Sequence, residues 1–214
     1  MREDHGPAPP GRGRLKRAFD VGMSIAALLL LAPLLAVVGL GVLLAMGRPV
    51  LFMQERIGLG GRPFRLFKFR TMRSGGPGGL LITGTGDSRV TRLGRFLRGT
   101  KLDELPQLVN VLKGDMSIVG PRPEVARYVA LYSQAQRQVL SVRPGLTDPA
   151  TVLFRDEESL LGAVPEPQRE DYYVREIVPR KLAINLDYLA HAGFWYDLRL
   201  IGRTMIALVD RRRS

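Results

Sequence analysis

The chain has 214 residues, enough for one domain with a substantial core, and its formal net charge of +12 indicates an anionic partner. Nucleic acid, a phosphate-bearing substrate and an acidic lipid surface would each satisfy that charge. The sequence has no cysteine and only two histidines, which excludes disulfides, a thiolate nucleophile and a histidine-rich metal site. A bound metal would therefore have oxygen ligands, which favours Mg²⁺ or Mn²⁺.

The N-terminal part of the chain predicts a tail followed by a membrane segment. Residues 1–13 are rich in proline, glycine and charge, which is typical of a disordered tail. The run from Val21 to Met46 carries no charge, and as a helix it would be about 39 Å long, more than the roughly 30 Å hydrocarbon core of a bilayer. We therefore expect the segment 14–48 to be inserted in a membrane.

The path of this segment through the membrane has two interpretations. Pro33 lies near its middle and predicts a kink, because proline removes one helical hydrogen bond. Basic residues flank both ends, so the positive-inside rule gives no orientation. The helix could cross the bilayer once, or it could enter one leaflet, break at Pro33 and return to the same face. A cleaved signal peptide is disfavoured, because the apolar run is too long and no small-residue cleavage site follows.

Two short runs, 50–53 and 64–69, predict a β-hairpin joined by the glycine-rich segment 58–61. The second run alternates apolar and basic residues, so Arg65, Lys68 and Arg70 are expected to face solvent or an anion. The glycine-rich segment 74–86 matches no phosphate-binding motif, and we expect it to be a mobile loop.

Residues 89–98 carry an arginine at every third position and predict an amphipathic basic helix. Its charged face could be solvated, could lie on anionic lipid headgroups, or could supply an arginine to a bound anion. We favour headgroup contact for most of these arginines and contact with the anion for Arg98, which precedes the carboxylates of the next segment.

The most informative segment is residues 101–124, which begin with the adjacent carboxylates Asp103 and Glu104. A helical run of apolar residues follows and ends at Lys113 and Gly114, a typical C-terminal cap. Neighbouring helical side chains point about 100° apart, so the two carboxylates are not expected to bind one metal as a pair. One of them could face a bound phosphate and its cation. They could also merely complement a helix dipole, a few tenths of a kcal/mol, but arginines on both sides favour an anion site.

The C-terminal part is expected to be mainly helical. Residues 125–142 predict a helix that ends at the turn 143–145, and residues 166–208 predict mostly amphipathic helix. Aromatic residues in this part are expected in the core or at a membrane interface. The arginines 211–213 suit a lipid headgroup region.

Several of these segments together resemble the bacterial sugar transferase family, the monotopic phosphoglycosyl transferases that initiate polysaccharide and glycan assembly. The resemblance covers about residues 14–155 closely and the C-terminal helices loosely. The matching segments are KRAFD, QERIGLGGRPFRLFKFRTM, TRLGRFLRGTKLDELPQLVNVLKGDMSIVGPRPE and RPGLT.

The resemblance implies an α+β, mostly helical fold with a proline-broken re-entrant membrane helix, a small β-hairpin and amphipathic interfacial helices. The catalytic domain would be residues 49–214, on the cytoplasmic face of the bacterial inner membrane. The implied reaction transfers a sugar phosphate from a UDP-sugar to polyprenyl phosphate and releases UMP. Anionic membrane lipids are the implied surroundings.

The resemblance also implies roles for individual residues. Asp103 would be the nucleophile that forms a covalent phospho-sugar intermediate, and it would also be a ligand of Mg²⁺, with Mn²⁺ as the alternative. Glu104 would position or deprotonate the polyprenyl phosphate. The implied contacts to substrate phosphates are Arg98, Arg122, Arg155, Lys68 and Arg143.

The chain departs from the family pattern at two places. It has alanine before Pro33 where relatives have serine, and residues 147–150 are Thr-Asp-Pro-Ala where many relatives have Gly-Trp-Ala-Gln. The second departure leaves the identity of the sugar open. The length of the polyprenol and the oligomeric state, with a homodimer as one option, are open as well.

Two functions from other classes remain as alternatives. A membrane-anchored nucleic-acid-binding protein would explain the charge, but the sequence has no helix-turn-helix, RNA-recognition or zinc-finger pattern, and we expect no nucleic-acid partner. A scaffold of a glycan-assembly complex would need neither the carboxylate pair nor a metal.

Overall fold

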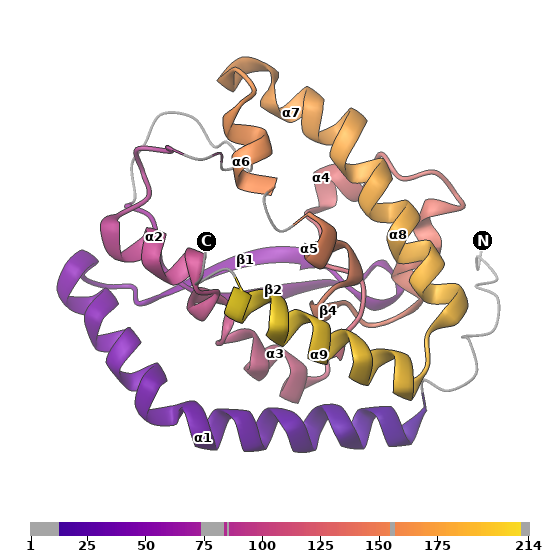
Figure 1. Cartoon of the computed structure of the whole chain (residues 1–214), viewed down its shortest axis with the longest axis horizontal. Coiled ribbons are helices and arrows are strands. Elements are labelled where there is room, and N and C mark those ends of the chain that lie inside the picture. Colours follow the sequence, from indigo (N-terminus) through magenta and orange to yellow (C-terminus); the bar gives the residue numbers. More distant parts are fainter. Residues whose placement is uncertain (1–12, 74–83, 85, 155–156, 211–214) are drawn as a thin grey trace.

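A computed structural model describes residues 13–73, 84, 86–154 and 157–210, and within them helices dominate (Figure 1). The helices are α1 (Arg14–Met46), α2 (Arg92–Gly99), α3 (Gln107–Lys113), α4 (Ala126–Val129), α5 (Pro149–Leu153), α6 (Glu157–Gly162), α7 (Arg169–Tyr172), α8 (Val178–His191) and α9 (Phe194–Asp210). The strands are β1 (Leu51–Ile57), β2 (Pro63–Phe69), β3 (Ser117–Val119) and β4 (Gly145–Thr147). The expected tail 1–13 and the loop 74–86 lie almost wholly outside the described residues.

The predicted hairpin is confirmed, and its strands are longer than the sequence pattern suggested. β1 and β2 are antiparallel, with Leu51 opposite Phe69 and Ile57 opposite Pro63. The connection contains a 3₁₀ turn whose glycines at positions 60 and 61 have positive φ angles, which glycine adopts without steric cost. Two apolar side chains of β2, Leu66 and Phe69, are buried and belong to different hydrophobic clusters.

One prediction for the hairpin is wrong, because Arg70 does not face solvent or an anion. Its side chain is only 8% exposed. Its guanidinium donates hydrogen bonds to the carbonyl oxygens of Met46, Gly47 and Arg48, the last two at 2.7 and 3.2 Å. These carbonyls lie at the C-terminal end of α1 and have no partner within the helix. Arg70 therefore holds the end of α1 on the hairpin.

Helix α1 is long and apolar enough to cross a membrane, and only 11% of its most apolar 18-residue stretch is buried. A core helix of a soluble domain would be mostly covered, so this helix indicates membrane association. The helix continues through Pro33, but its axis changes direction part-way along (Figure 1). A proline that removes one hydrogen bond bends a helix without ending it.

Both ends of α1 contact the rest of the protein. Near its start, Arg17 donates hydrogen bonds to the carbonyl oxygens of Val111 and Leu112, at 2.6 and 2.8 Å, and so caps the C-terminal end of α3. The Asp20 side chain accepts a hydrogen bond of 3.1 Å from the backbone of Ile118 in β3. Near the other end, α1 packs in a cluster that includes Phe69 and Leu97.

A second sheet, which the sequence did not predict, joins two of the family motifs. β3 and β4 are parallel, and they bring residues 117–121 beside residues 144–147. The two backbone segments approach so closely that a Cβ atom on Gly145 would lie 2.1 Å from the Gly120 nitrogen. Only glycine fits there, and the close approach fixes the loop that carries Arg122.

The helix predicted for residues 125–142 is wrong. The structure has the short α4 and a separate 3₁₀ turn, Gln136–Ser141. Ser133 and Gln136 exchange hydrogen bonds between their side chains and backbone nitrogens, at 2.8 and 3.3 Å. This reciprocal pattern is a capping box, which starts a new turn in place of a continuing helix.

The basic helix expected at 89–98 begins three residues later, as α2. Thr91 caps it, since its hydroxyl oxygen accepts a hydrogen bond of 2.9 Å from the Gly94 nitrogen. Arg89 precedes the helix and forms an ion pair of 2.6 Å with Asp87. The helix packs so tightly that a Cβ atom on Gly94 would lie 2.0 Å from the Thr71 carbonyl oxygen.

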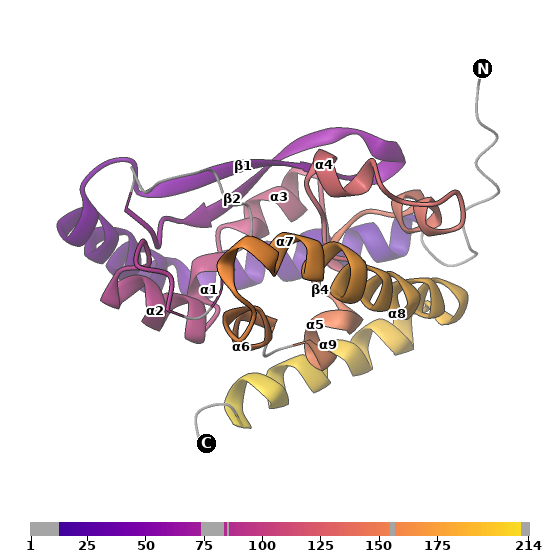
Figure 2. The ribbon, with the colours of Figure 1, turned by 90° about the horizontal axis from the view of Figure 1, so that it is seen from above.

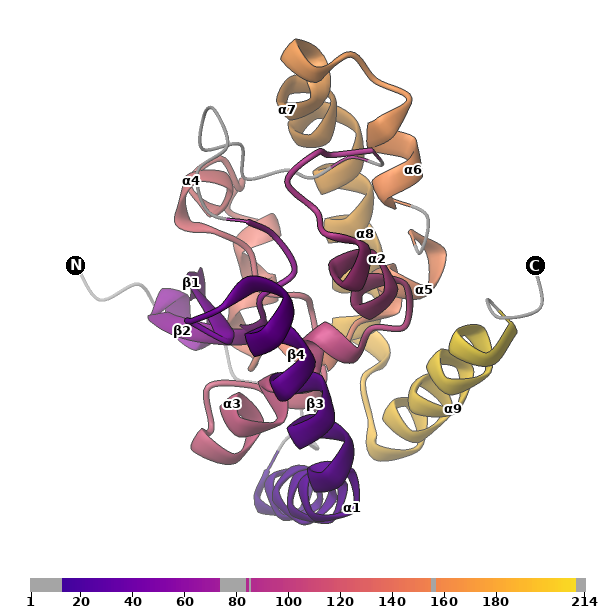
Figure 3. The same ribbon diagram turned by 90° about the vertical axis from the view of Figure 1, so that its left-hand side faces the viewer.

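The predicted C-terminal helices are confirmed as α7, α8 and α9. Figures 2 and 3 place the β1–β2 hairpin along one edge of the molecule and α9 along the opposite edge. Some aromatic residues of this part are buried and others are exposed. Tyr173 and Tyr188 lie in hydrophobic clusters, whereas Trp195 on α9 is 73% exposed.

We expect Gly94→Ala to destabilise the protein by roughly 1–3 kcal/mol, because α2 must move away from residue 71. Gly99→Ala is a matched control in the same helix, since a Cβ atom there meets nothing within 4 Å. That control should be neutral or slightly stabilising. Thermal unfolding of the two variants in detergent measures the difference, and equal melting temperatures would contradict the packing described for α2.

Candidate active site

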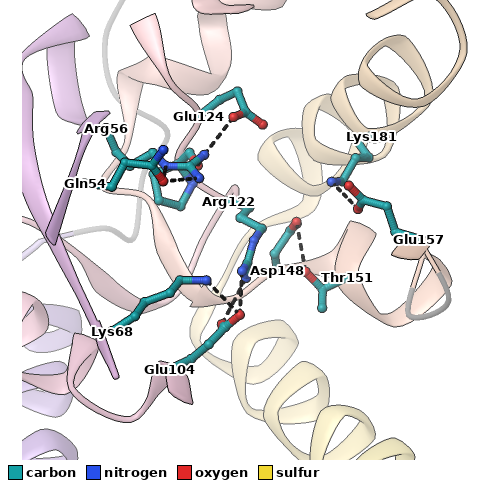
Figure 4. Close-up of polar contacts among 11 residues, drawn as sticks. Gln54, Arg56, Lys68, Glu104, Arg122, Glu124, Asp148, Thr151, Glu157 and Lys181 are labelled. Carbon is teal, nitrogen blue, oxygen red and sulfur yellow. Dashed lines mark hydrogen bonds and ion pairs between the residues drawn. The ribbon is translucent and has the colours of Figure 1, made fainter. Parts of the chain in front are cut away.

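Glu104 is the centre of a cluster of charged side chains from three separate elements (Figure 4). Its Oε1 atom lies 2.6 Å from a guanidinium nitrogen of Arg122 and 3.2 Å from Lys68 Nζ. A second nitrogen of Arg122 donates to Oε2 at 3.2 Å, so the arginine binds the carboxylate with two hydrogen bonds. The residues Glu104, Lys68 and Arg122, far apart in sequence, are thus brought together.

Asn110 fixes the position of Lys68 relative to Glu104. Its fully buried side chain accepts a hydrogen bond of 3.0 Å from the Phe67 nitrogen and donates one of 2.7 Å to the Arg65 carbonyl. Phe67, which donates to Asn110, is followed in β2 by Lys68. Helix α3, which carries Asn110, follows the turn of Glu104, so Asn110 connects the two segments. The sequence signal for such a role is a polar residue between the apolar residues Val109 and Val111 of a helical run.

The loop that carries Arg122 is held on both sides. The Gly120 nitrogen donates to the Thr147 carbonyl at 3.0 Å, and the Ile57 nitrogen donates to the Glu124 carbonyl at 2.8 Å. Glu124 also forms an ion pair of 2.7 Å with Arg56. The hairpin and the parallel sheet therefore both position Arg122.

The two carboxylates do not lie in the first turn of the helix, which corrects the prediction from the sequence. They occupy a separate 3₁₀ turn, Leu102–Glu104, which follows Lys101 in a left-handed backbone conformation with φ of 59°. Helix α3 begins only at Gln107. The turn points Glu104 to Lys68 and Arg122, and gives Asp103 different surroundings.

Asp103 is buried, and its surroundings differ from those of Glu104. It is 6% exposed, and its Oδ1 atom has no hydrogen-bond partner among the described residues. Burial, together with the adjacent charge of Glu104, raises the pKa of Asp103 to about 6, although Lys68, Lys101 and Arg98 partly oppose the rise. Near neutral pH this side chain is therefore a carboxylate with an open oxygen.

The surroundings of Glu104 shift its pKa in the direction opposite to that of Asp103. Burial works against its ionisation, but Arg122, Lys68 and Lys101 outweigh burial and hold the pKa of Glu104 well below its usual range. Burial lowers the pKa of Lys68, and Glu104 opposes that shift. The pKa of Arg122 is raised, chiefly by Glu104. Glu104 is thus permanently ionised and occupied by its two cations.

The described residues contain no group of three acidic, histidine or cysteine side chains that could form a metal cage. Mg²⁺ does not need one, because it keeps several waters and commonly binds one or two carboxylates together with substrate phosphates. The open oxygen of Asp103 fits this mode of binding. Glu104 does not fit it, because both its oxygens already accept hydrogen bonds from cations.

The other predicted contacts lie in different places. Arg98 is in the last turn of α2, near enough for its charge to lower the pKa of Asp103. Arg143 is not part of the cluster, since it donates a hydrogen bond of 2.9 Å to the Gly114 carbonyl at the far end of α3. Arg155 lies outside the described residues.

Asp148 is a buried acidic residue near Arg122 that the sequence reasoning did not include. It is 1% exposed and caps α5 by accepting a hydrogen bond of 3.0 Å from the Ala150 nitrogen. Its charge contributes to the raised pKa of Arg122. The sequence signal was Asp148 before Pro149, a common start of a helix, which predicts a cap but not a neighbour of the site.

Comparison with known protein families matches residues 11–211 to the bacterial sugar transferases. The chain belongs to that family. The match includes the ion-pair cluster, the β3–β4 pair and the exposed apolar helix α1.

Three characterised relatives carry specific names. The UDP-glucose:undecaprenyl-phosphate glucose-1-phosphate transferases of Caulobacter vibrioides and Escherichia coli are 39% and 35% identical, over 91% and 89% of this chain. An Aeromonas hydrophila UDP-N-acetylgalactosamine-undecaprenyl-phosphate N-acetylgalactosaminephosphotransferase is 39% identical over 89% of it. The matched region spans 69%, 39% and 43% of these relatives' own lengths, in the same order.

Substitutions that neutralise the two adjacent carboxylates should change the free energy of unfolding in opposite directions. At pH 7.5 we expect Asp103→Asn to stabilise the fold by on the order of 1–3 kcal/mol, because a raised pKa means that ionised Asp103 costs folding energy. The gain should shrink as the pH falls from about 6 towards 4, because wild-type Asp103 then becomes protonated in the folded state and no longer incurs the cost of a buried charge. Glu104→Gln should destabilise the fold by roughly 2–3 kcal/mol, since it leaves two cations without their partner.

Thermal unfolding in detergent at several pH values measures both effects. If Asp103→Asn is as destabilising as Glu104→Gln, Asp103 is paired and the described asymmetry of the site is wrong.

Proposed function

We propose that the protein transfers a sugar-1-phosphate from a UDP-sugar to polyprenyl phosphate and releases UMP, as a first membrane step of polysaccharide or glycoconjugate assembly. The names of the relatives, which specify a UDP-sugar donor and undecaprenyl phosphate, support this reaction. The observation that carries the proposal is the buried Asp103 with an open oxygen beside a cluster of cations.

In the first step, Asp103 acts as the nucleophile. Its carboxylate oxygen attacks the sugar-bearing phosphorus of the donor, the bond from that phosphorus to the bridging oxygen breaks, and UMP leaves with that oxygen. A carboxylate needs no general base at neutral pH. The covalent intermediate is a phospho-sugar on Asp103, and a single site can then take its two anionic substrates in turn.

In the second step, an oxygen of polyprenyl phosphate attacks the same phosphorus, and the Asp103 carboxylate is released. The product is a polyprenyl diphosphate sugar. Arg122 and Lys68, held by Glu104, would present positive charge where the transferred phosphate accumulates negative charge. The low pKa of Glu104 supports a positioning role and argues against proton abstraction from the acceptor.

A divalent cation is part of this proposal. Asp103 would hold Mg²⁺, or Mn²⁺, together with phosphate oxygens of the donor, and the ion would neutralise the diphosphate charge. Arg98 would add a further positive charge on the same side, because its charge already acts on Asp103.

We also propose that α1 is re-entrant and that the domain lies on the cytoplasmic face of the bacterial inner membrane. The contacts at both ends of α1 support this topology, since a helix that crossed the bilayer would hold its ends on opposite sides. The native chain has no cysteine, so Arg14→Cys and Arg48→Cys give single labelling sites. Periplasmic labelling of either site would contradict the topology.

Release of UMP tests the proposed reaction. Purified protein with Mg²⁺, undecaprenyl phosphate and a panel of UDP-sugars should release UMP with at least one donor, and chelation of the metal should abolish the release. Asp103→Asn should lower turnover by more than about 10³-fold, since it removes the nucleophile. A protein that is indifferent to the metal and to every donor would be a scaffold.

The pH dependence follows from the raised pKa of Asp103. We expect kcat/KM for the UDP-sugar to rise about tenfold per pH unit below pH 6 and to level off above it, because only the ionised side chain attacks. The donor is the better substrate for this measurement, because the acceptor phosphate itself titrates near pH 6. A flat profile between pH 5 and 8 would contradict the assignment of Asp103.

A further inference from the structure

A small cavity with both polar and apolar lining lies behind Arg122, between the loop 120–124 and helix α8. Its volume is about 40 Å³. The charged or polar side chains that line it are Arg122, Glu124, Tyr132, Asp148, Tyr173, Lys181 and Asn185, and the other lining residues are apolar or glycine. Figure 4 shows Asp148 next to Arg122, with Lys181 beyond it on α8. The cavity thus adjoins the arginine to which we assign phosphate binding.

Most of these side chains already have partners within the protein. Glu124 binds Arg56 and accepts a hydrogen bond of 2.6 Å from the Tyr173 hydroxyl. Lys181 forms an ion pair of 2.6 Å with Glu157. These internal contacts fix the positions of Glu124, Tyr173 and Lys181 in the wall of the cavity.

Asn185 differs from its neighbours. It is 4% exposed, and its Oδ1 atom has no hydrogen-bond partner within the described residues. A buried amide oxygen without a partner costs free energy, so its presence calls for a ligand or water that donates a hydrogen bond.

The size and chemistry of the cavity fit one edge of a sugar ring. About 40 Å³ accommodates roughly three groups of the size of a water molecule, such as neighbouring hydroxyls, and is too small for a nucleoside. Carboxylate, ammonium, amide and phenol groups together offer both donors and acceptors, as a sugar requires. The phosphate that Arg122 would bind is one oxygen away from the sugar in the donor.

We propose that this cavity is the subsite for the sugar of the UDP-sugar donor, in which Asn185 Oδ1 accepts a hydrogen bond from one ring hydroxyl. The inference rests on the proposed function. It makes Asn185, on a C-terminal helix, a residue that determines which sugar is transferred. The departure of residues 147–150 from the family pattern lies in the same wall, because Asp148 is one of them.

The test pairs the residue with the hydroxyl it would bind. The preferred donor is first found with UDP-glucose, UDP-galactose, UDP-N-acetylglucosamine and UDP-N-acetylgalactosamine, and kcat/KM is then measured for its monodeoxy analogues. For the wild type, one analogue should lose about tenfold or more, because the hydroxyl is missing. Asn185→Leu should lose a similar factor with the parent donor and should no longer distinguish it from that analogue.

Two further variants serve as controls. Asp187→Leu changes an exposed residue of the same helix and should keep the wild-type pattern of donors. Asn185→Ala replaces the leucine variant if that variant does not fold. The leucine variant is expected to keep or raise the melting temperature, because it removes an unpaired buried oxygen.

The outcomes separate the subsite from the reaction. If Asn185→Leu lowers kcat/KM for the parent donor and all its analogues by one common factor, or changes none, the cavity holds structural water and the subsite is wrong. If the wild type releases UMP from no donor, the proposed function itself fails, whatever the variants do.

Discussion

The structure depends on an unequal division of positive charge between two adjacent buried carboxylates. Glu104 is bound by Arg122 and Lys68 and stays ionised, whereas the neighbouring Asp103 is buried with an open oxygen. Three elements create this difference. The β1–β2 hairpin carries Lys68, the 3₁₀ turn carries both carboxylates, and the parallel strands hold the loop of Arg122. Burial without a partner costs stability, and the oxygen left without a partner among the described residues is the atom that we propose as the nucleophile.

Helix α3 connects α1 to the site. It follows the two carboxylates in the chain, and Arg17 of α1 donates hydrogen bonds to carbonyl oxygens at its C-terminal end. At the other end of α1, Arg70 binds the last carbonyls of the helix from the residue that follows β2, the strand of Lys68. Two arginines, Arg17 and Arg70, therefore set the orientation of the site relative to α1.

The sequence predicted the elements whose signals are local. The apolar run gave α1, alternation gave the hairpin, and Lys113 with Gly114 gave the end of α3. It did not predict features that depend on contacts between distant residues. Arg70 resembled an anion ligand because a basic side chain looks the same in sequence whether it meets a phosphate or a helix end. The β3–β4 pair was missed because three-residue strands have no periodicity, and the capping box that interrupts residues 125–142 was outweighed by the apolar pattern. Of the candidate site, the carboxylates, Lys68 and Arg122 were named from the sequence, but their unequal partners required the fold.

The most direct test of the central claim is intact-protein mass spectrometry of wild type and Asp103→Asn after incubation with Mg²⁺ and UDP-sugars, without polyprenyl phosphate. The account predicts that one donor adds the mass of its phospho-sugar to the wild type alone, and that later addition of polyprenyl phosphate removes it. An adduct on Asp103→Asn would show that another residue is the nucleophile. Release of UMP in the presence of polyprenyl phosphate, with no adduct at any time in its absence, would contradict the covalent step on Asp103.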